Sequence, residues 1–107
     1  MGMLRTLLVA ARGEIAVRIM ATAAVLGLRT VAVYPDDDVD CAHVARADAS
    51  VRLPGAGSAA YLDIPAVVAA ARQAGAGAVH SQHGLALVTW KAWKSARTAS
   101  NTTMTSA

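Results

Sequence analysis

The first third of the chain changes its hydrophobic pattern at one short polar segment. Positions 7–11 are apolar without interruption, the segment 12–14 reads Arg-Gly-Glu, and apolar residues then recur at helical spacing as far as Leu26. An unbroken apolar run closed by a polar turn is typical of a strand buried on both faces. The pattern predicts a strand over 4–10, a tight turn and a helix over 14–26, with Gly27 ending the helix at positive φ.

Strands and helices continue to alternate further along the chain. The predicted elements are a strand over 29–34 stopped by Pro35, an acidic loop with a short helix near 40–46, a strand over 49–53, a helix over 61–75 and a strand over 77–80. In the helix over 61–75, Asp63 is the expected N-cap and Gly75 the expected C-cap. This alternation predicts an α/β fold with a Rossmann-like parallel sheet and helices on both faces.

The last part of the chain lacks such a pattern. We predict one domain over 3–88 and a divergent, partly disordered tail over 89–107, which is rich in Ala, Ser and Thr. Trp90, Trp93 and Lys94 have the spacing of an amphipathic helical turn. Such a turn is expected to dock on the edge of the sheet, with a partner-binding surface as the alternative.

Composition narrows the class of protein. The chain has 107 residues, of which 55% are hydrophobic and 16% charged, so it suits one small domain with a single core. The net charge is +3, but the basic residues are scattered except at 91–97, and nucleic acid is not an expected partner. Cys41 is the only cysteine, which fits a cytoplasmic location, and no apolar run approaches the roughly 18 residues of a membrane helix.

The turn at 11–14 stands where nucleotide-binding proteins place a glycine-rich phosphate loop. Here the turn has one glycine, Gly13, and Glu14 would place a negative charge where a phosphate should lie. Asp36 follows the second strand, roughly where a ribose-binding acid would stand. We therefore interpret Gly13 as a structural residue, because a side chain there would crowd the strand end or strain the backbone.

Two metal sites can be considered from residue spacing. Asp36, Asp38 and Asp40 alternate as in a calcium loop, but Cys41 stands where that loop needs glycine. Cys41 and His43, together with His80 and His83, could supply four zinc ligands. Neither arrangement has further support, so we predict no metal site.

Three stretches of the sequence resemble the N-terminal domain of biotin carboxylase. They are "LLVAARGEIAVRI", "LGLRTVAVYPDDDVDCAHVARADASVRL" and "SAAYLDIPAVVAAARQAGAGAVH", all in one register. The family signature is A-N-R-G-E-I-A, in which Ala11 here replaces the asparagine. The resemblance implies a pre-ATP-grasp domain of a biotin-dependent acetyl-CoA, propionyl-CoA or pyruvate carboxylase.

The resemblance also implies a reaction. In the family, ATP activates bicarbonate as carboxyphosphate, and the carboxyl group passes to biotin. The ligands of ATP, magnesium and bicarbonate lie mostly on the ATP-grasp portion that follows the N-terminal domain. We therefore expect this chain to bind no cofactor alone, to need an ATP-grasp domain or carboxylase subunit as partner, and not to be catalytic by itself.

One loop of the family's N-terminal domain, H-P-G-Y-G-F-L-S-E-N, lies near the biotin. The corresponding stretch here is "HSQHGLALVT", in which His80 and Gly84 match and His83 replaces the tyrosine. The resemblance makes His80, His83 and Gly84 candidate biotin-side residues. Its abrupt loss after His80 suggests a truncated or frame-disrupted gene, and a non-catalytic remnant or protein-interaction module is the alternative function.

The resemblance assigns an interface role to two arginines. Arg12 is expected to face the ATP-grasp unit, and Arg18 matches a charged residue of the family's homodimer contact. Ala21 and Val25 stand where that contact typically has an arginine and a glutamate. Because their hydrogen bonds and charges would be missing, we expect no family-type homodimer.

Overall fold

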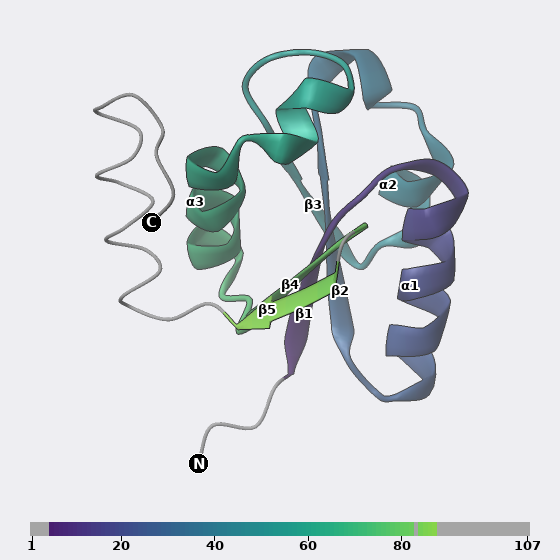
Figure 1. Ribbon diagram of the computed structural model, residues 1–107. Coiled ribbons are helices and arrows are strands. Elements are labelled where there is room, and N and C mark those ends of the chain that lie inside the picture. The colour runs from purple at the N-terminus through teal and green to yellow at the C-terminus, as the bar shows by residue number, and fades with distance from the viewer. Residues whose placement is uncertain (1–4, 83, 88–107) are drawn as a thin grey trace.

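The computed structural model describes residues 5–82 and 84–87 (Figure 1). Its elements in chain order are β1 Thr6–Ala10, α1 Gly13–Val25, β2 Arg29–Tyr34, the 3-10 helix η1 Asp36–Asp38, α2 Ala42–Arg46, β3 Ala49–Arg52, the 3-10 helix η2 Ser58–Leu62, α3 Ile64–Ala74, β4 Ala78–Ser81 and β5 Gly84–Leu87. The predicted tail over 89–107, with its tryptophan-containing turn, lies outside the described residues, as does His83.

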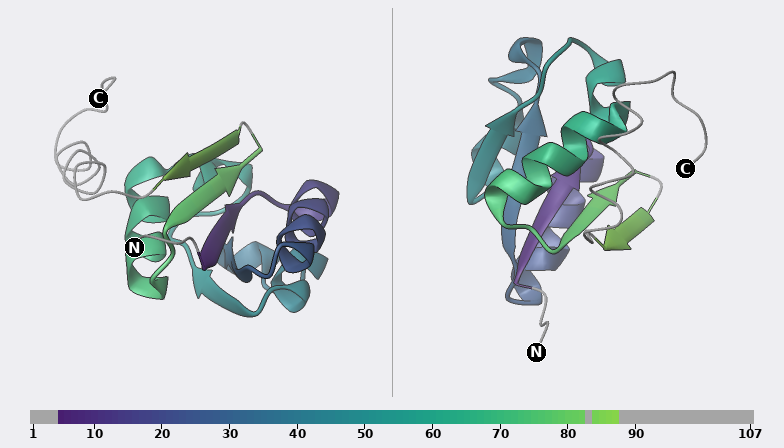
Figure 2. Two further views of the ribbon diagram at one scale, coloured as in Figure 1. Left: turned by 90° about the horizontal axis from the view of Figure 1, so that it is seen from below. Right: turned by 90° about the vertical axis from the view of Figure 1, so that its left-hand side faces the viewer.

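The strands form one sheet in the order β3-β2-β1-β4-β5. The first four strands are parallel, and β5 runs antiparallel to β4 at the margin opposite β3 (Figure 2). The chain therefore moves outward from β1 to β2 and β3, then returns to the other side of β1 with β4. This reversal of direction between β1 and β4 is a topological switch point, where open α/β sheets bind ligands.

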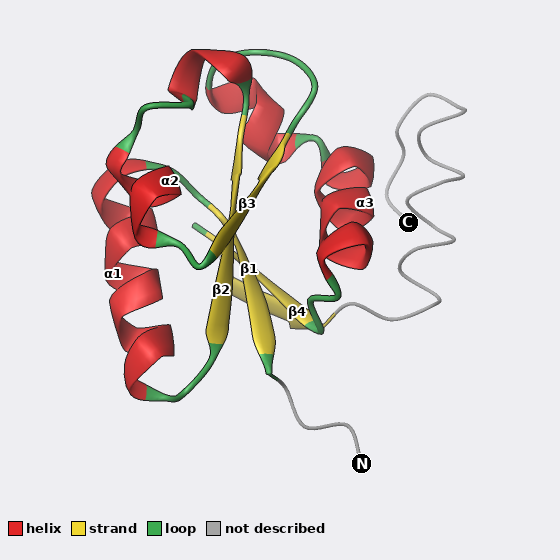
Figure 3. Ribbon diagram, turned by 180° about the vertical axis from the view of Figure 1, so that it is seen from behind, coloured by secondary structure: helices red, strands yellow, loops and turns green. Residues whose placement is uncertain are grey.

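Helices cover the sheet on both faces, with α1 and α2 on one side and α3 on the other (Figure 3). Leu7 and Val9 of β1 belong to the core cluster that also contains buried residues of α1. Leu8 and Ala10 belong to the cluster that contains buried residues of α3. Successive side chains of a strand point to opposite faces, so a strand covered on both sides must be apolar throughout. This explains the unbroken apolar run of the sequence.

The predicted fold class is confirmed, with local differences. The antiparallel strand β5 was not predicted, and the segment predicted as the start of the helix over 61–75 instead forms η2, so α3 begins at Ile64. Asp63 is the N-cap of α3, and its carboxylate accepts a hydrogen bond from the Ala66 amide at 3.2 Å. Gly75 has a φ of 72° and ends α3, as expected.

Gly13 has a φ of 65°, which confirms that the backbone at the turn is left-handed. The expectation of crowding is wrong, because a Cβ added at Gly13 would meet no heavy atom within 4 Å. The requirement for glycine therefore comes from backbone conformation alone. The left-handed residue lets the chain leave β1 and enter α1 without a longer loop.

Candidate functional site

The carboxyl ends of β1 and β4 lie side by side at the switch point. Ala10, the last residue of β1, pairs with Ser81, the last residue of β4. Arg12 follows β1 after one residue, Ala11, and is the N-cap of α1; its side chain is 44% exposed. The sequence thus delivers a charged side chain to the edge of the sheet where this fold class places its ligands.

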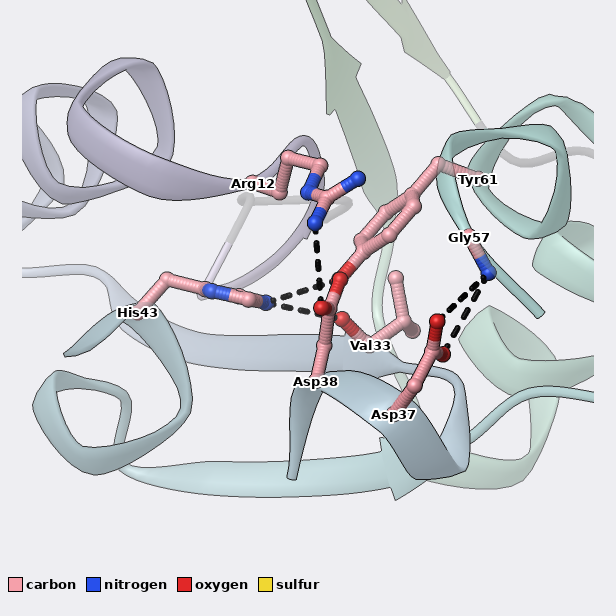
Figure 4. Close-up of polar contacts among 7 residues, drawn as sticks. All are labelled: Arg12, Val33, Asp37, Asp38, His43, Gly57 and Tyr61. Atoms are coloured by element: carbon pink, nitrogen blue, oxygen red, sulfur yellow. Dashed lines mark hydrogen bonds and ion pairs between the residues drawn. The ribbon is translucent and has the colours of Figure 1, made fainter. Parts of the chain in front are cut away.

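Four polar side chains lie together at this edge and form what we call the Asp38 cluster: Arg12, Asp38, His43 and Tyr61 (Figure 4). Arg12 Nη2 lies 3.1 Å from Asp38 Oδ1, and the Tyr61 hydroxyl lies 2.8 Å from Asp38 Oδ2. His43 Nε2 lies 3.2 Å from the Tyr61 hydroxyl and 3.2 Å from the Val33 carbonyl oxygen. Asp38 and Tyr61 are buried, and His43 is fully so.

The direction of each hydrogen bond follows from the chemistry of the groups. The ion-paired Asp38 carboxylate can only accept, so the single hydroxyl proton of Tyr61 is donated to it. The Val33 carbonyl also only accepts, so His43 carries its proton on Nε2 and shares it between that carbonyl and the Tyr61 oxygen. His43 Nδ1 then bears no proton, and it is buried without a hydrogen-bond partner in the part of the chain that the structure describes.

The other two aspartates of η1 hold different segments at the same edge. Asp36 binds the Arg52 guanidinium through two hydrogen bonds, of 2.5 and 2.9 Å. Both oxygens of Asp37 accept from the Gly57 amide, at 3.3 and 3.1 Å, and this carboxylate points toward Gly57 (Figure 4). The acidic run after β2 therefore ties together β3, the start of η2 and the β1–α1 turn.

Two pKa values in and beside the cluster are displaced from their ordinary values. Burial and the hydrogen bond to Asp38 raise the pKa of Tyr61, so this side chain keeps its proton throughout the physiological range. Burial, followed by the charge of the nearby Asp38 carboxylate, raises the pKa of the Cys41 thiol. Cys41 is consequently a poor nucleophile at neutral pH.

The structure brings together some of the sequence-predicted site residues and separates others. His80 lies on β4 and Gly84 on the neighbouring strand β5, and β4 pairs with β1, which ends two residues before Arg12. His80 donates from Nδ1 to the Ser81 carbonyl oxygen at 2.7 Å, and Gly84 begins β5 with a φ of 138°. Arg18 lies apart on the exposed face of α1, where it pairs with Glu14 at 2.9 Å.

The described residues do not fit a bound nucleotide or metal. The β1–α1 turn has one glycine, Glu14 stands in the first turn of α1, and Asp36 is occupied by Arg52 instead of being free for a ribose. Within residues 5–82 and 84–87, no three His, Cys, Asp or Glu side chains are placed to hold a metal ion.

Sequence reasoning missed the cluster around Arg12. In the sequence interpretation, Asp38 and His43 enter as metal ligands without further support, and Tyr61 enters as the start of a helix. One signal was available, since Asp38 closely follows β2 at the edge where Arg12 follows β1. Tyr61 is 23 residues further along than Asp38. No local pattern indicates that its hydroxyl returns to the same carboxylate.

The fold and the site define a Rossmann-like α/β domain whose polar cluster lies at the switch point of the sheet. Comparison with known proteins identifies its family. Residues 3–87 match the model of the family described as "Biotin carboxylase, N-terminal domain". The chain belongs to this family, as the resemblance predicted.

Individual relatives agree with the family match. Biotin carboxylase of Haemophilus influenzae is 46% identical over 83 residues, which are 77% of this chain and 18% of that protein. The mitochondrial methylcrotonoyl-CoA carboxylase subunit alpha of Oryza sativa is 51% identical over 78 residues, which are 72% of this chain and 11% of that protein. The chain thus spans less than a fifth of the length of either relative.

Solved structures show the same fold. The biotin carboxylase–β-γ-ATP complex from Campylobacter jejuni is similar with a TM-score of 0.72 and 38% identity, over 77% of this chain and 19% of that one. The biotin carboxylase domain of a single-chain bacterial carboxylase gives a TM-score of 0.71 and 46% identity, over 75% and 19% of the two chains. In both, the similarity covers one domain of a larger enzyme. No helix among the described residues is long and apolar enough to cross a membrane.

Proposed function

We propose that this chain supplies the N-terminal domain of a biotin carboxylase, which carboxylates biotin with bicarbonate at the expense of ATP, and that it is not catalytic alone. The family match over residues 3–87 carries the proposal. In this role, the carboxyl edge with Arg12 faces an ATP-grasp domain, and His80, His83 and Gly84 lie on the biotin side. Arg18 belongs to a different face, that of α1.

Complementation between fragments tests the proposal. The chain is mixed with Haemophilus influenzae biotin carboxylase from which the matching N-terminal segment has been removed, and ATP cleavage is measured with free biotin and bicarbonate. We expect the mixture to cleave ATP in a biotin-dependent manner and each component alone to be inactive. Biotin-dependent ATP cleavage by the chain alone would show that the domain does not need a partner.

One observation favours a second function, that of a non-catalytic protein-interaction module. In the segment that corresponds to the family's biotin-side loop, the described residues 80–82 and 84–87 form the end of β4, part of a turn and the antiparallel strand β5. A chain that binds the shortened carboxylase without restoring ATP cleavage would support this alternative. A matched variant in which Ser81, Gln82 and His83 are replaced by Pro, Gly and Tyr distinguishes the two functions. If this variant restores ATP cleavage to the mixture, the inactivity of the parent chain is due to this loop.

A further inference from the structure

Two contacts from distant parts of the chain fix the orientation of Arg12. Its Nη2 donates to Asp38 Oδ1, and its Cζ lies 5.8 Å from the centroid of the Tyr61 ring, within the range of a cation–π interaction. A guanidinium carries five N–H donors. Among the described residues, Arg12 donates one of its five to a hydrogen-bond acceptor, which is Asp38 Oδ1. The half-exposed group therefore retains donors for an acceptor outside this domain.

The position of Asp38 depends in turn on Tyr61. The Asp38 side chain is 5% exposed, and a buried carboxylate is stable only when its charge and its lone pairs are both satisfied. Arg12 satisfies one oxygen, and the Tyr61 hydroxyl satisfies the other. Without that hydroxyl, Asp38 Oδ2 would lose its buried donor, and the carboxylate would move toward water together with its arginine.

His43 fixes the direction of the Tyr61 hydroxyl. Its Nε2–H, anchored on the Val33 carbonyl, also points to the Tyr61 oxygen, so that oxygen accepts from the histidine and donates to Asp38. The hydrogen bonds thus run in one direction, from His43 through Tyr61 to Asp38, where the ion pair with Arg12 completes the cluster. Because each donor and acceptor has a defined role, the cluster has a single hydrogen-bonding pattern.

We propose that Asp38 and Tyr61 are positioning residues, which hold the Arg12 guanidinium at the carboxyl edge in the orientation that contacts the rest of a biotin carboxylase. The contact itself rests on the proposed function above. The ordering of Arg12 does not, since it follows from contacts within this chain. The two parts can therefore be tested separately.

Hydrogen exchange at the Arg12 Nη protons, one of which is donated to Asp38, tests the ordering. It is measured by NMR on the 107-residue chain with labelled arginine, and Arg12→Lys identifies the signal. In the parent chain we expect Arg12 to exchange more slowly than Arg18, whose side chain is 79% exposed. Tyr61→Phe keeps the aromatic ring and removes the hydroxyl, and it should accelerate exchange at Arg12 roughly tenfold or more, as expected for loss of a hydrogen bond to a charged group.

Thr30→Val is the matched control. Thr30 is equally buried and hydrogen-bonds Asp48 at 3.2 Å, but it lies near the amino end of β2, away from Arg12. It should lower stability and leave Arg12 exchange unchanged. Equal acceleration in both variants, or none in Tyr61→Phe, would contradict the proposal. If neither variant folds, the parent chain still tests the proposal. Hydrogen exchange at Arg12 that is as fast as at Arg18 would show that Arg12 is not held in one orientation.

Binding to the shortened Haemophilus influenzae enzyme tests the contact. We expect Tyr61→Phe to weaken this binding at least fivefold more than Thr30→Val does. Faster Arg12 exchange with unchanged binding would mean that the cluster orders Arg12 without serving the contact, and the proposal would be wrong. Failure of the parent chain to bind would overturn the proposed function, and hydrogen exchange alone would then decide the positioning role.

Discussion

At Gly13, backbone conformation alone explains why the position requires glycine. Its φ is 65° and no atom lies where a Cβ would stand. Gly13→Ala should therefore cost about 1–2 kcal/mol of unfolding free energy, the usual cost of a left-handed L-residue. Gly13→Asn should cost less, because asparagine tolerates this region better than other L-residues do. Urea denaturation of the two variants measures the difference, and equal stability of Gly13→Ala and the parent would contradict the backbone argument.

Cys41 reports on the same cluster through its thiol. Because burial and Asp38 raise the pKa of the thiol, a smaller fraction is thiolate at pH 8 than for an ordinary cysteine, and alkylation by iodoacetamide should be slow. Asp38→Asn removes the negative charge beside Cys41. The pKa of the thiol should therefore fall, and alkylation of Cys41 should be faster. Thr30→Val, which does not touch Cys41, is the control. An alkylation rate that is unchanged in Asp38→Asn would show that the carboxylate does not influence this thiol.

At the scale of single elements, α1 and α3 begin in different ways. Asp63 caps α3 through the Ala66 amide, whereas Arg12 at the start of α1 makes no side-chain cap. Asp63→Ala should cost about 1 kcal/mol, and Asp63→Asn, which still accepts a hydrogen bond, much less. Thermal melting compares Asp63→Ala with Asp63→Asn.

Glu14→Gln should cost about 0.5 kcal/mol or less of unfolding free energy, because both Glu14 and its partner Arg18 are exposed.

At the scale of the whole molecule, the exposed face of α1 decides whether copies of the chain associate as in the family. Arg18 is paired with Glu14 within its own helix, and Ala21 and Val25 expose no hydrogen-bonding side chain. Sedimentation should therefore show a monomer whose mass is unchanged by Arg18→Ala. A compact dimer that Arg18→Ala dissociates would contradict this prediction. Val25→Glu serves as a control for apolar association through the same face, since Val25 is 86% exposed.

The sequence by itself determined the four parallel strands and the presence of helices on both faces of the sheet. Continuous apolar runs indicated buried strands, helical spacing indicated α1 and α3, and Gly27 and Gly75 indicated where helices end, because each signal depends on neighbours within a few residues. The resemblance added the family, which the comparisons confirm, and it predicted that Arg12 faces an ATP-grasp unit. The strand β5 was missed, since its four residues carry no pattern that distinguishes them from a loop.

Only the tertiary structure decided what surrounds Arg12. The separations between Arg12 and Asp38, and between Asp38 and Tyr61, are 26 and 23 residues. Such contacts arise because parallel strands bring their carboxyl ends to one edge, and η2 then returns the chain over that edge. An aspartate in an acidic run is usually solvated, and nothing local marks which of the three in η1 becomes buried. Burial and long-range hydrogen bonding belong to the packed molecule, because they depend on segments that meet only after the sheet has formed.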